Sequence, residues 1–158
     1  MKKPAWPWLF ALSAGLIFLD RLTKGFVYAA DLREPLEVVP GFFRIIKTWN
    51  TGLAFGTLSE ASARIMNPAI IVIGTAAILW ILYLLLFQRQ GRAITVSFHL
   101  LLAGAAGNVY DRLRWGAVLD FLEFHAGRFY WPAFNVADSC ITVGLALLVW
   151  DMVAASRK

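Results

Sequence analysis

Charged residues and cysteine are scarce in this 158-residue sequence. Asp, Glu, Lys and Arg together make up only 16% of it, whereas about a quarter is usual in a soluble domain. The single cysteine, Cys140, excludes an internal disulfide, and its apolar surroundings predict a buried thiol rather than a nucleophile. His99 and His125 lie far apart and outside any His–carboxylate motif, so we predict no metal site and no cofactor.

Hydrophobic residues dominate instead, at 59% of the chain, and the mean hydropathy is +0.65. Crossing a bilayer takes about 20 helical residues, and four apolar runs reach or approach that length. They predict transmembrane helices over Trp8–Val27, Ile65–Phe87, Ala93–Tyr110 and Phe134–Trp150. Because no linker, repeat or low-complexity tract interrupts the sequence, we predict one integral membrane domain over residues 1–158.

The net charge of +5 arises from basic residues dispersed beside the apolar runs, which favours membrane flanks over a nucleic-acid-binding surface. With four spans both termini lie on one side, and the short, densely basic segments predict that this side is cytoplasmic. These segments contain Lys2, Lys3, Arg89, Arg92, Arg157 and Lys158. A cleavable signal peptide at the start is disfavoured, because charged residues follow the apolar run where small residues would mark a cleavage site.

Two connections between the predicted helices are rich in β-branched and aromatic residues. Leu36–Val39 and Phe42–Trp49 flank a Pro-Gly turn, and Val118–Phe124 and Phe129–Trp131 form a second strand pair. Unpaired strand edges cannot lie in hydrocarbon, so both pairs belong at the membrane surface. The predicted fold is a mainly α-helical membrane protein with four transmembrane helices and a small β-rich cradle at the outer face.

Three carboxylates, Asp111, Asp120 and Asp138, lie beside or within apolar sequence. An ionisable group at membrane depth costs roughly 3 kcal/mol unless it is paired or faces water, so each is a functional candidate. If Asp120 and Asp138 meet, mutual repulsion and desolvation raise the pKa of one and create an acid and a base that activate water. Such a pair hydrolyses a peptide bond without a nucleophilic Ser or Cys.

The other polar residues near the apolar runs have helical spacing. Asp20 and Lys24 are four residues apart and predict a structural ion pair. Asn108, Asp111 and Arg112 are spaced i, i+3 and i+4, which predicts one polar network in which Arg112 neutralises Asp111.

Two asparagines allow two interpretations each. Asn135, three residues before Asp138, either orients that carboxylate or caps the last helix. Asn50 and Gly52 supply an amide and a flexible backbone that either pair with an extended peptide or form an ordinary turn.

The order and spacing of these motifs resemble lipoprotein signal peptidases, the bacterial signal peptidase II family of membrane aspartic proteases. The resemblance extends over almost the whole chain. Its motifs are Asp20 with Thr23 and Lys24, Asn50-Thr51-Gly52-Leu53-Ala54-Phe55, Gly107-Asn108-Val109-Tyr110-Asp111-Arg112, Val118-Leu119-Asp120-Phe121 and Phe134-Asn135-Val136-Ala137-Asp138-Ser139. One departure is Gly56, where many relatives have a small hydroxyl residue.

The resemblance implies a role for each motif. Asp120 and Asp138 would be the catalytic dyad. Asn50, Gly52, Asn108, Arg112 and Asn135 would bind substrate or support the site, and Asp20, Lys24 and Asp111 would give structural support. The implied reaction is hydrolysis, by water, of a prolipoprotein immediately before its diacylglyceryl-modified cysteine. It would occur at the outer face of the bacterial cytoplasmic membrane, among membrane lipids, without nucleic acid or an obligate protein partner.

Two other classes of function fit the intramembrane charges. A small carrier or proton-conducting subunit would use Asp20, Asp111 and Asp138 as a polar path, but it leaves Asp120 in the surface hairpin without a role. A helix-packing scaffold would merely satisfy all the carboxylates as pairs. It predicts that conservative loss of Asp120 or Asp138 spares substrate processing.

Overall fold

The computed structural model describes residues 8–52 and 60–156. Several residues singled out in the sequence lie outside these ranges: Leu53, Ala54, Phe55 and Gly56 of the second motif, and Lys2, Lys3, Arg157 and Lys158 near the chain ends.

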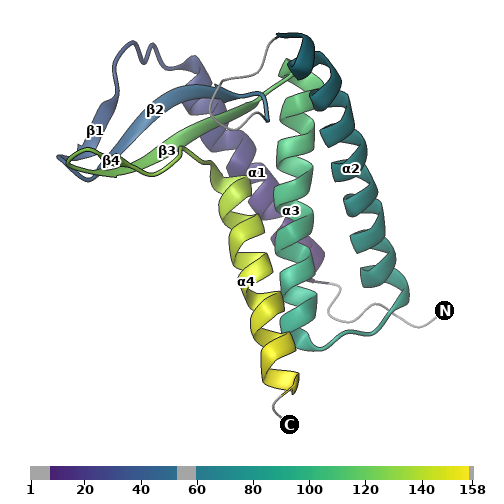
Figure 1. Cartoon of the computed structure of the whole chain (residues 1–158). Coiled ribbons are helices and arrows are strands. Elements are labelled where there is room, and N and C mark those ends of the chain that lie inside the picture. Colours follow the sequence, from purple (N-terminus) through teal and green to yellow (C-terminus); the bar gives the residue numbers. More distant parts are fainter. Residues whose placement is uncertain (1–7, 53–59, 157–158) are drawn as a thin grey trace.

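Four long helices form the body of the protein (Figure 1). They are α1 (Leu9–Ala29), α2 (Glu60–Phe87), α3 (Arg92–Trp115) and α4 (Val136–Ser156). Helix α3 lies between the others and packs against all three of them. It continues beyond its predicted end at Tyr110, so Asp111 and Arg112 also lie on the helix.

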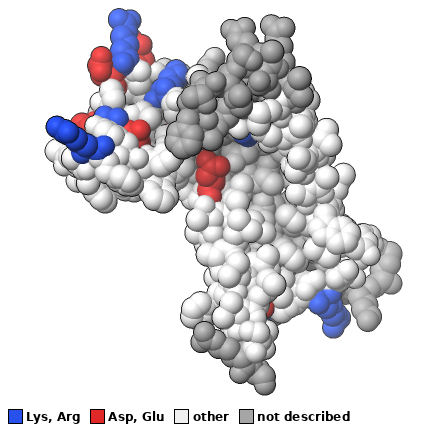
Figure 2. All heavy atoms as spheres, viewed as in Figure 1, with Lys and Arg blue, Asp and Glu red and all other residues white. Residues whose placement is uncertain are grey.

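Three of the described helices are long and apolar enough to cross a membrane: Met66–Phe87 within α2, and the whole of α3 and α4. Helix α1 is the fourth, with 21 residues, and it contains Asp20, Arg21 and Lys24. Between the two ends of the bundle, the face in Figure 2 shows almost only uncharged residues. The predicted class, a mainly helical membrane protein with a small β-sheet, is confirmed.

The strands form one antiparallel sheet at one end of the bundle, opposite the end where α1 begins and α4 finishes (Figure 1). Its order is β1 (Leu36–Val39), β2 (Phe43–Asn50), β3 (Val118–Ala126) and β4 (Phe129–Tyr130). Both predicted hairpins are present. Pairing of β2 with β3 joins them into a single sheet, which the sequence had not indicated.

The register between β2 and β3 brings two predicted site residues together. Thr48 lies opposite Asp120, and Asn50 lies opposite Val118, beyond a bulge in β2. A bulge inserts an extra residue and re-aims the side chains that follow it. On the bundle side, buried Leu119 packs against Val27 of α1 and fixes the sheet to the helices.

Two glycines let α1 and α4 approach α3 closely. A Cβ at Gly104 would lie 2.4 Å from the carbonyl oxygen of Ala137, and one at Gly107 would lie 2.8 Å from Asp20 Oδ2. A side chain at Gly104 would therefore displace the first turn of α4, which contains Asp138.

Candidate active site

Asp120, on β3, is enclosed by two amide side chains. Its side chain is buried, with 2% exposure. Oδ2 accepts a hydrogen bond from Asn50 Nδ2 at 2.9 Å, and Oδ1 accepts one from Asn135 Nδ2 at 2.6 Å. Strand β2 and the start of α4 thus hold this carboxyl from opposite sides.

Asp138, in the first turn of α4, is held from α3 and is partly exposed. Its Oδ1 accepts a hydrogen bond from Asn108 Nδ2 at 2.7 Å, and its Oδ2 accepts one from the Asn135 backbone N–H at 3.2 Å. Asn108 Oδ1 in turn lies 3.4 Å from Asn135 Nδ2. Asn108, from the predicted polar motif on α3, therefore hydrogen-bonds directly to the Asp138 carboxyl group.

Asn135 contacts both aspartates. Its Oδ1 accepts the backbone N–H of Asp138 at 2.9 Å, while Asp138 accepts the backbone N–H of Asn135. This reciprocal arrangement is a capping box, which satisfies the free donors at a helix start. Because the Asn135 side chain also donates to Asp120, it both caps α4 and orients a carboxyl. The capping interpretation from the sequence therefore holds, whereas the carboxyl to which the Asn135 amide donates is that of Asp120 and not that of Asp138.

The environment raises the pKa of Asp120 to about 6. Burial is the largest cause, and the nearby charge of Asp138 acts in the same direction. Hydrogen bonds from Asn50 and Asn135 oppose the shift without cancelling it. Asp120 therefore holds a proton at a higher pH than an ordinary aspartic acid does.

Asp111 is not neutralised by Arg112, contrary to the sequence prediction. Its carboxylate forms ion pairs with Arg21 and with Lys24 Nζ, the latter at 2.7 Å. Adjacent helical residues point in different directions, so Asp111 faces α1 while Arg112 does not. The charges acting most strongly on Arg112 are those of Asp138 and then Asp120.

The predicted ion pair between Asp20 and Lys24 is confirmed, with Lys24 Nζ 2.9 Å from Asp20 Oδ2. It belongs to a larger cluster, because Arg21 also contacts Asp20 at 2.6 Å and both cations contact Asp111. Asp20, Lys24 and Asp111 are almost completely buried. Asp20 Oδ1 accepts the backbone N–H of Ala137 at 3.0 Å, so the cluster links α1 and α3 to the residue preceding Asp138.

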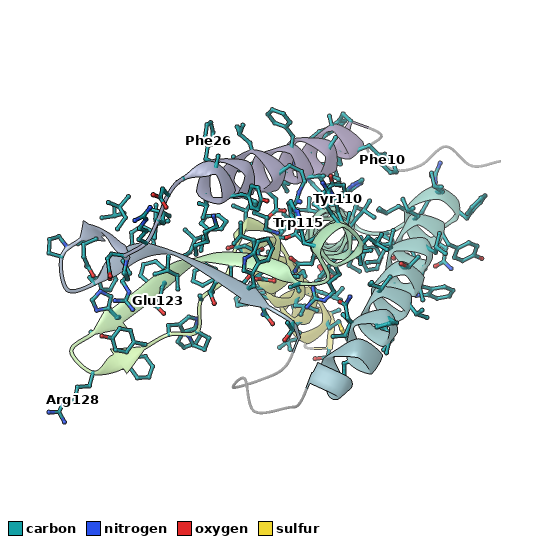
Figure 3. The ribbon with its side chains drawn as sticks, turned by 90° about the horizontal axis from the view of Figure 1, so that it is seen from above. Phe10, Phe26, Tyr110, Trp115, Glu123 and Arg128 are labelled. Atoms are coloured by element: carbon teal, nitrogen blue, oxygen red, sulfur yellow. The ribbon has the colours of Figure 1, made fainter. Side chains whose placement is uncertain are left out.

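Arg21 was missed by the sequence reasoning. Its guanidinium lies over the Tyr110 ring, 4.7 Å from the centroid, and near the Trp115 ring at 5.8 Å. Figure 3 shows both aromatic residues on α3, close to α1. Its position beside Asp20 could have indicated this role. Asp20 and Asp111 are both buried, and two buried carboxylates require two cations.

Asn50 and Gly52 form a turn. Asn50 Oδ1 accepts the Gly52 N–H at 2.8 Å while its amide nitrogen donates to Asp120. Gly52 has φ +88°, a backbone conformation that favours glycine. A Cβ there would lie 2.5 Å from Ile70 Cδ1, so space as well as conformation favours glycine.

A hollow opens beside Asp138, with a volume of about 310 Å³. Its lining residues are Trp131, Phe134, Asp138, Ser139, Thr142 and Val143. Figure 2 shows acidic atoms between the sheet end and the helices, with uncharged residues below them. A carboxyl group in the wall of a largely apolar hollow suits a substrate with a polar group next to an apolar segment.

Comparison with known proteins gives a consistent result. The family described as "Signal peptidase (SPase) II" matches residues 12–154. A lipoprotein signal peptidase of Azoarcus sp. (strain BH72) is 42% identical over 155 residues, covering 96% of this chain and 85% of the relative. One of Burkholderia mallei (strain SAVP1) is 43% identical over 151 residues, covering 96% and 90%.

Solved structures agree with the sequence matches. A bacterial membrane enzyme determined by the in meso method at 2.3 Å resolution superposes with a TM-score of 0.82 and 27% identity, covering 99% of this chain and 94% of the other. A second, at 1.9 Å resolution, gives a TM-score of 0.80 and 28% identity, covering 96% and 97%. The family resemblance drawn from the motifs is confirmed, and the chain belongs to the signal peptidase II family of bacterial membrane peptidases, which remove signal peptides from prolipoproteins.

Proposed function

We propose that Asp120 and Asp138 are the catalytic dyad of this peptidase. The observation that carries the assignment is Asn135, which donates to Asp120 and exchanges two hydrogen bonds with Asp138. Two carboxyl groups that accept hydrogen bonds from the side chain and the backbone N–H of one residue are near enough to share a water molecule and a scissile bond. The other carboxyl oxygen of Asp120 accepts a hydrogen bond from Asn50, and that of Asp138 accepts one from Asn108.

The environments of the two carboxyl groups assign their roles. Asp120 is buried and its pKa is raised, so it is the acid that donates a hydrogen bond to the scissile carbonyl oxygen. Asp138 is partly exposed beside the hollow and is the base that takes a proton from water. The resulting hydroxide attacks the carbonyl carbon while the proton of Asp120 passes to the carbonyl oxygen.

Collapse of the tetrahedral intermediate breaks the C–N bond. The proton taken up by Asp138 passes to the leaving amine, and Asp120 recovers its proton as the carboxyl product forms. The dyad thus returns to its starting state, and no covalent enzyme intermediate is required. Arg112, whose strongest charge partners are the two aspartates, offsets the negative charge that develops on the carbonyl oxygen.

This assignment predicts an alkaline limb in the pH profile at an unusually high pH. The protonated form of Asp120 predominates below about pH 6 and is lost above it. We therefore expect kcat/KM to fall as pH rises through an apparent pKa near 6, which belongs to the coupled dyad. Measurement from pH 3 to 8.5 on a lipidated peptide checks this, with unfolding monitored at each pH as the control. A limb near pH 4 would contradict the role of Asp120 as acid.

We further propose that the substrate is diacylglyceryl-modified and is cleaved at the outer face of the cytoplasmic membrane. The site lies at the sheet end of the bundle, and Arg89 and Arg92, between α2 and α3, lie at the opposite end. Short basic connections favour the cytoplasmic side, so the sheet end faces outward. The substrate's signal helix and acyl chains then remain in lipid while its scissile bond reaches the dyad.

The purified chain in lipid, without other proteins, should cleave a diacylglyceryl-modified prolipoprotein. Mass spectrometry of the product should find the lipidated cysteine as the new N-terminus. A matched prolipoprotein without the lipid modification is the control and should remain largely intact. Absence of cleavage by a folded chain would favour the carrier or the scaffold, and cleavage at another bond would contradict the proposed substrate register.

A further inference from the structure

The sheet has two chemically different faces. Every second side chain of β3 points to the same face of the sheet. One face therefore carries Asp120, Leu122 and Phe124, and it is apolar beyond Asp120. On the other face, Leu119 and Phe121 are buried in a cluster with Val27 of α1, and charge appears only beyond them, where Arg44 of β2 pairs with Glu123 of β3. An apolar strip therefore begins at Asp120 and runs away from the bundle.

This strip ends in an aromatic cavity of about 380 Å³. Phe42, Phe124, Ala126, Phe129, Trp131 and Phe134 line it, together with His125. The polar edge of His125 is engaged elsewhere, since its ring stacks on Tyr130 and its Nε2 lies 3.4 Å from Glu37. The volume is within the range of about 300–1,000 Å³ that is usual for small-molecule sites.

The aromatic cavity adjoins the hollow beside Asp138, because Trp131 and Phe134 line both. Backbone hydrogen bonds hold this shared wall to β3. Trp131 N–H donates to the Phe124 oxygen at 2.8 Å, and Phe134 N–H donates to the Leu122 oxygen at 3.0 Å. The two hollows thus meet at Trp131 and Phe134, which places the aromatic cavity next to the hollow that contains Asp138.

The chemistry of the lining favours a hydrocarbon chain over a peptide. An extended peptide needs partners for its N–H and C=O groups. Near the cavity, the Leu122 and Phe124 backbone groups are already paired with the 131–134 segment. A hydrocarbon chain needs no partners, and its burial against aromatic side chains is favourable because it removes apolar surface from water.

We propose that the aromatic cavity binds an acyl chain of the diacylglyceryl group on the substrate's cysteine. This inference rests on the proposed function, in which the lipidated cysteine directly follows the scissile bond and its acyl chains therefore start beside the dyad. Asp120 and Phe124 are four residues apart on a strand, about 13 Å, which a long acyl chain spans. The cavity makes the enzyme sensitive to the acyl length of its substrate.

Filling the cavity tests the proposal. Ala126→Trp places an indole in it from an exposed strand position, whereas Arg128→Trp adds the same group at the hairpin tip, which Figure 3 shows pointing away from the helices. Both variants and the native chain are assayed on two prolipoproteins that differ only in acyl length, dihexadecanoyl and dioctanoyl. Phe129→Asp, at an exposed cavity wall, is a second disruption with a different folding risk.

We expect Ala126→Trp to raise KM for the long-chain substrate at least about tenfold, with kcat nearly unchanged and a smaller effect on the short-chain substrate. Phe129→Asp should do the same, and Arg128→Trp should behave like the native chain. Equal KM values for native and both folded cavity variants would overturn the proposal. So would an equal rise on both substrates, which would identify the cavity as a contact for bulk membrane lipid. Failure of the native chain to cleave either substrate would instead reject the proposed function.

Discussion

Replacing Asp120 or Asp138 with asparagine is expected to lower kcat by at least about 10³-fold. Each substitution preserves the shape of the side chain but removes a group that donates or accepts a proton. In both variants KM should change much less, because substrate binding relies on the apolar hollow and the sheet. Single-turnover cleavage of a lipidated prolipoprotein measures the loss of the chemical step directly.

Asp31→Asn is the matched control, since Asp31 is an exposed acid whose one ionic partner among the described residues is the exposed Arg33. It should cleave at the native rate. Thermal unfolding of all three variants separates a loss of chemistry from a loss of fold. If folded Asp120→Asn or Asp138→Asn retains near-native turnover, the dyad assignment is wrong and the scaffold interpretation gains support.

Lys24→Met is expected to destabilise the protein by about 3–5 kcal/mol. Lys24 has no exposed side-chain surface, and its ammonium group lies within 3 Å of both Asp20 and Asp111. Its removal leaves two buried carboxylates facing Arg21 alone, so one negative charge is uncompensated. Unfolding in detergent should show a loss of roughly 10 °C in Tm for a chain of this size.

A second substitution tests the cause. Asp111→Asn removes the excess charge while keeping an oxygen for Arg21, so Lys24→Met combined with Asp111→Asn should recover part of the lost stability. Lys47→Met is the surface control, because Lys47 is exposed and contacts a backbone oxygen of Tyr28. It should cost less than about 1 kcal/mol. If the double variant instead loses the sum of the stabilities lost by the two single variants, the destabilisation comes from lost packing rather than from charge.

Local patterns in the sequence predicted most of the fold. Period-two aromatic and β-branched runs gave the strands, and Leu36–Val39 has the predicted bounds. The apolar runs gave the helices, although α3 extends to Trp115 because its last turn packs around Arg21 instead of ending at Tyr110. Such patterns indicate which side chains of one segment are buried. They do not indicate which residues of a distant segment those side chains contact.

The candidate site shows the same division. The types and positions of Asp120, Asp138 and Asn135 were visible in the sequence, but their hydrogen bonds were not. The partners of Asp111 were predicted wrongly, because an adjacent arginine is near in sequence while Arg21 and Lys24 face it from another helix. Pairing of β2 with β3 likewise joins segments some 70 residues apart, as the hydrogen bond from Asn50 to Asp120 illustrates.

The hydrogen bond from Ala137 to Asp20 joins residues 117 positions apart and has a consequence for biogenesis. Asp138 and the Asn135 cap belong to the last described helix, so a nascent chain that has inserted only α1, α2 and α3 possesses half of the proposed dyad. Proteolytic competence therefore arises only after the ribosome has delivered α4. By this assignment, partly synthesised chains are inert toward neighbouring membrane proteins.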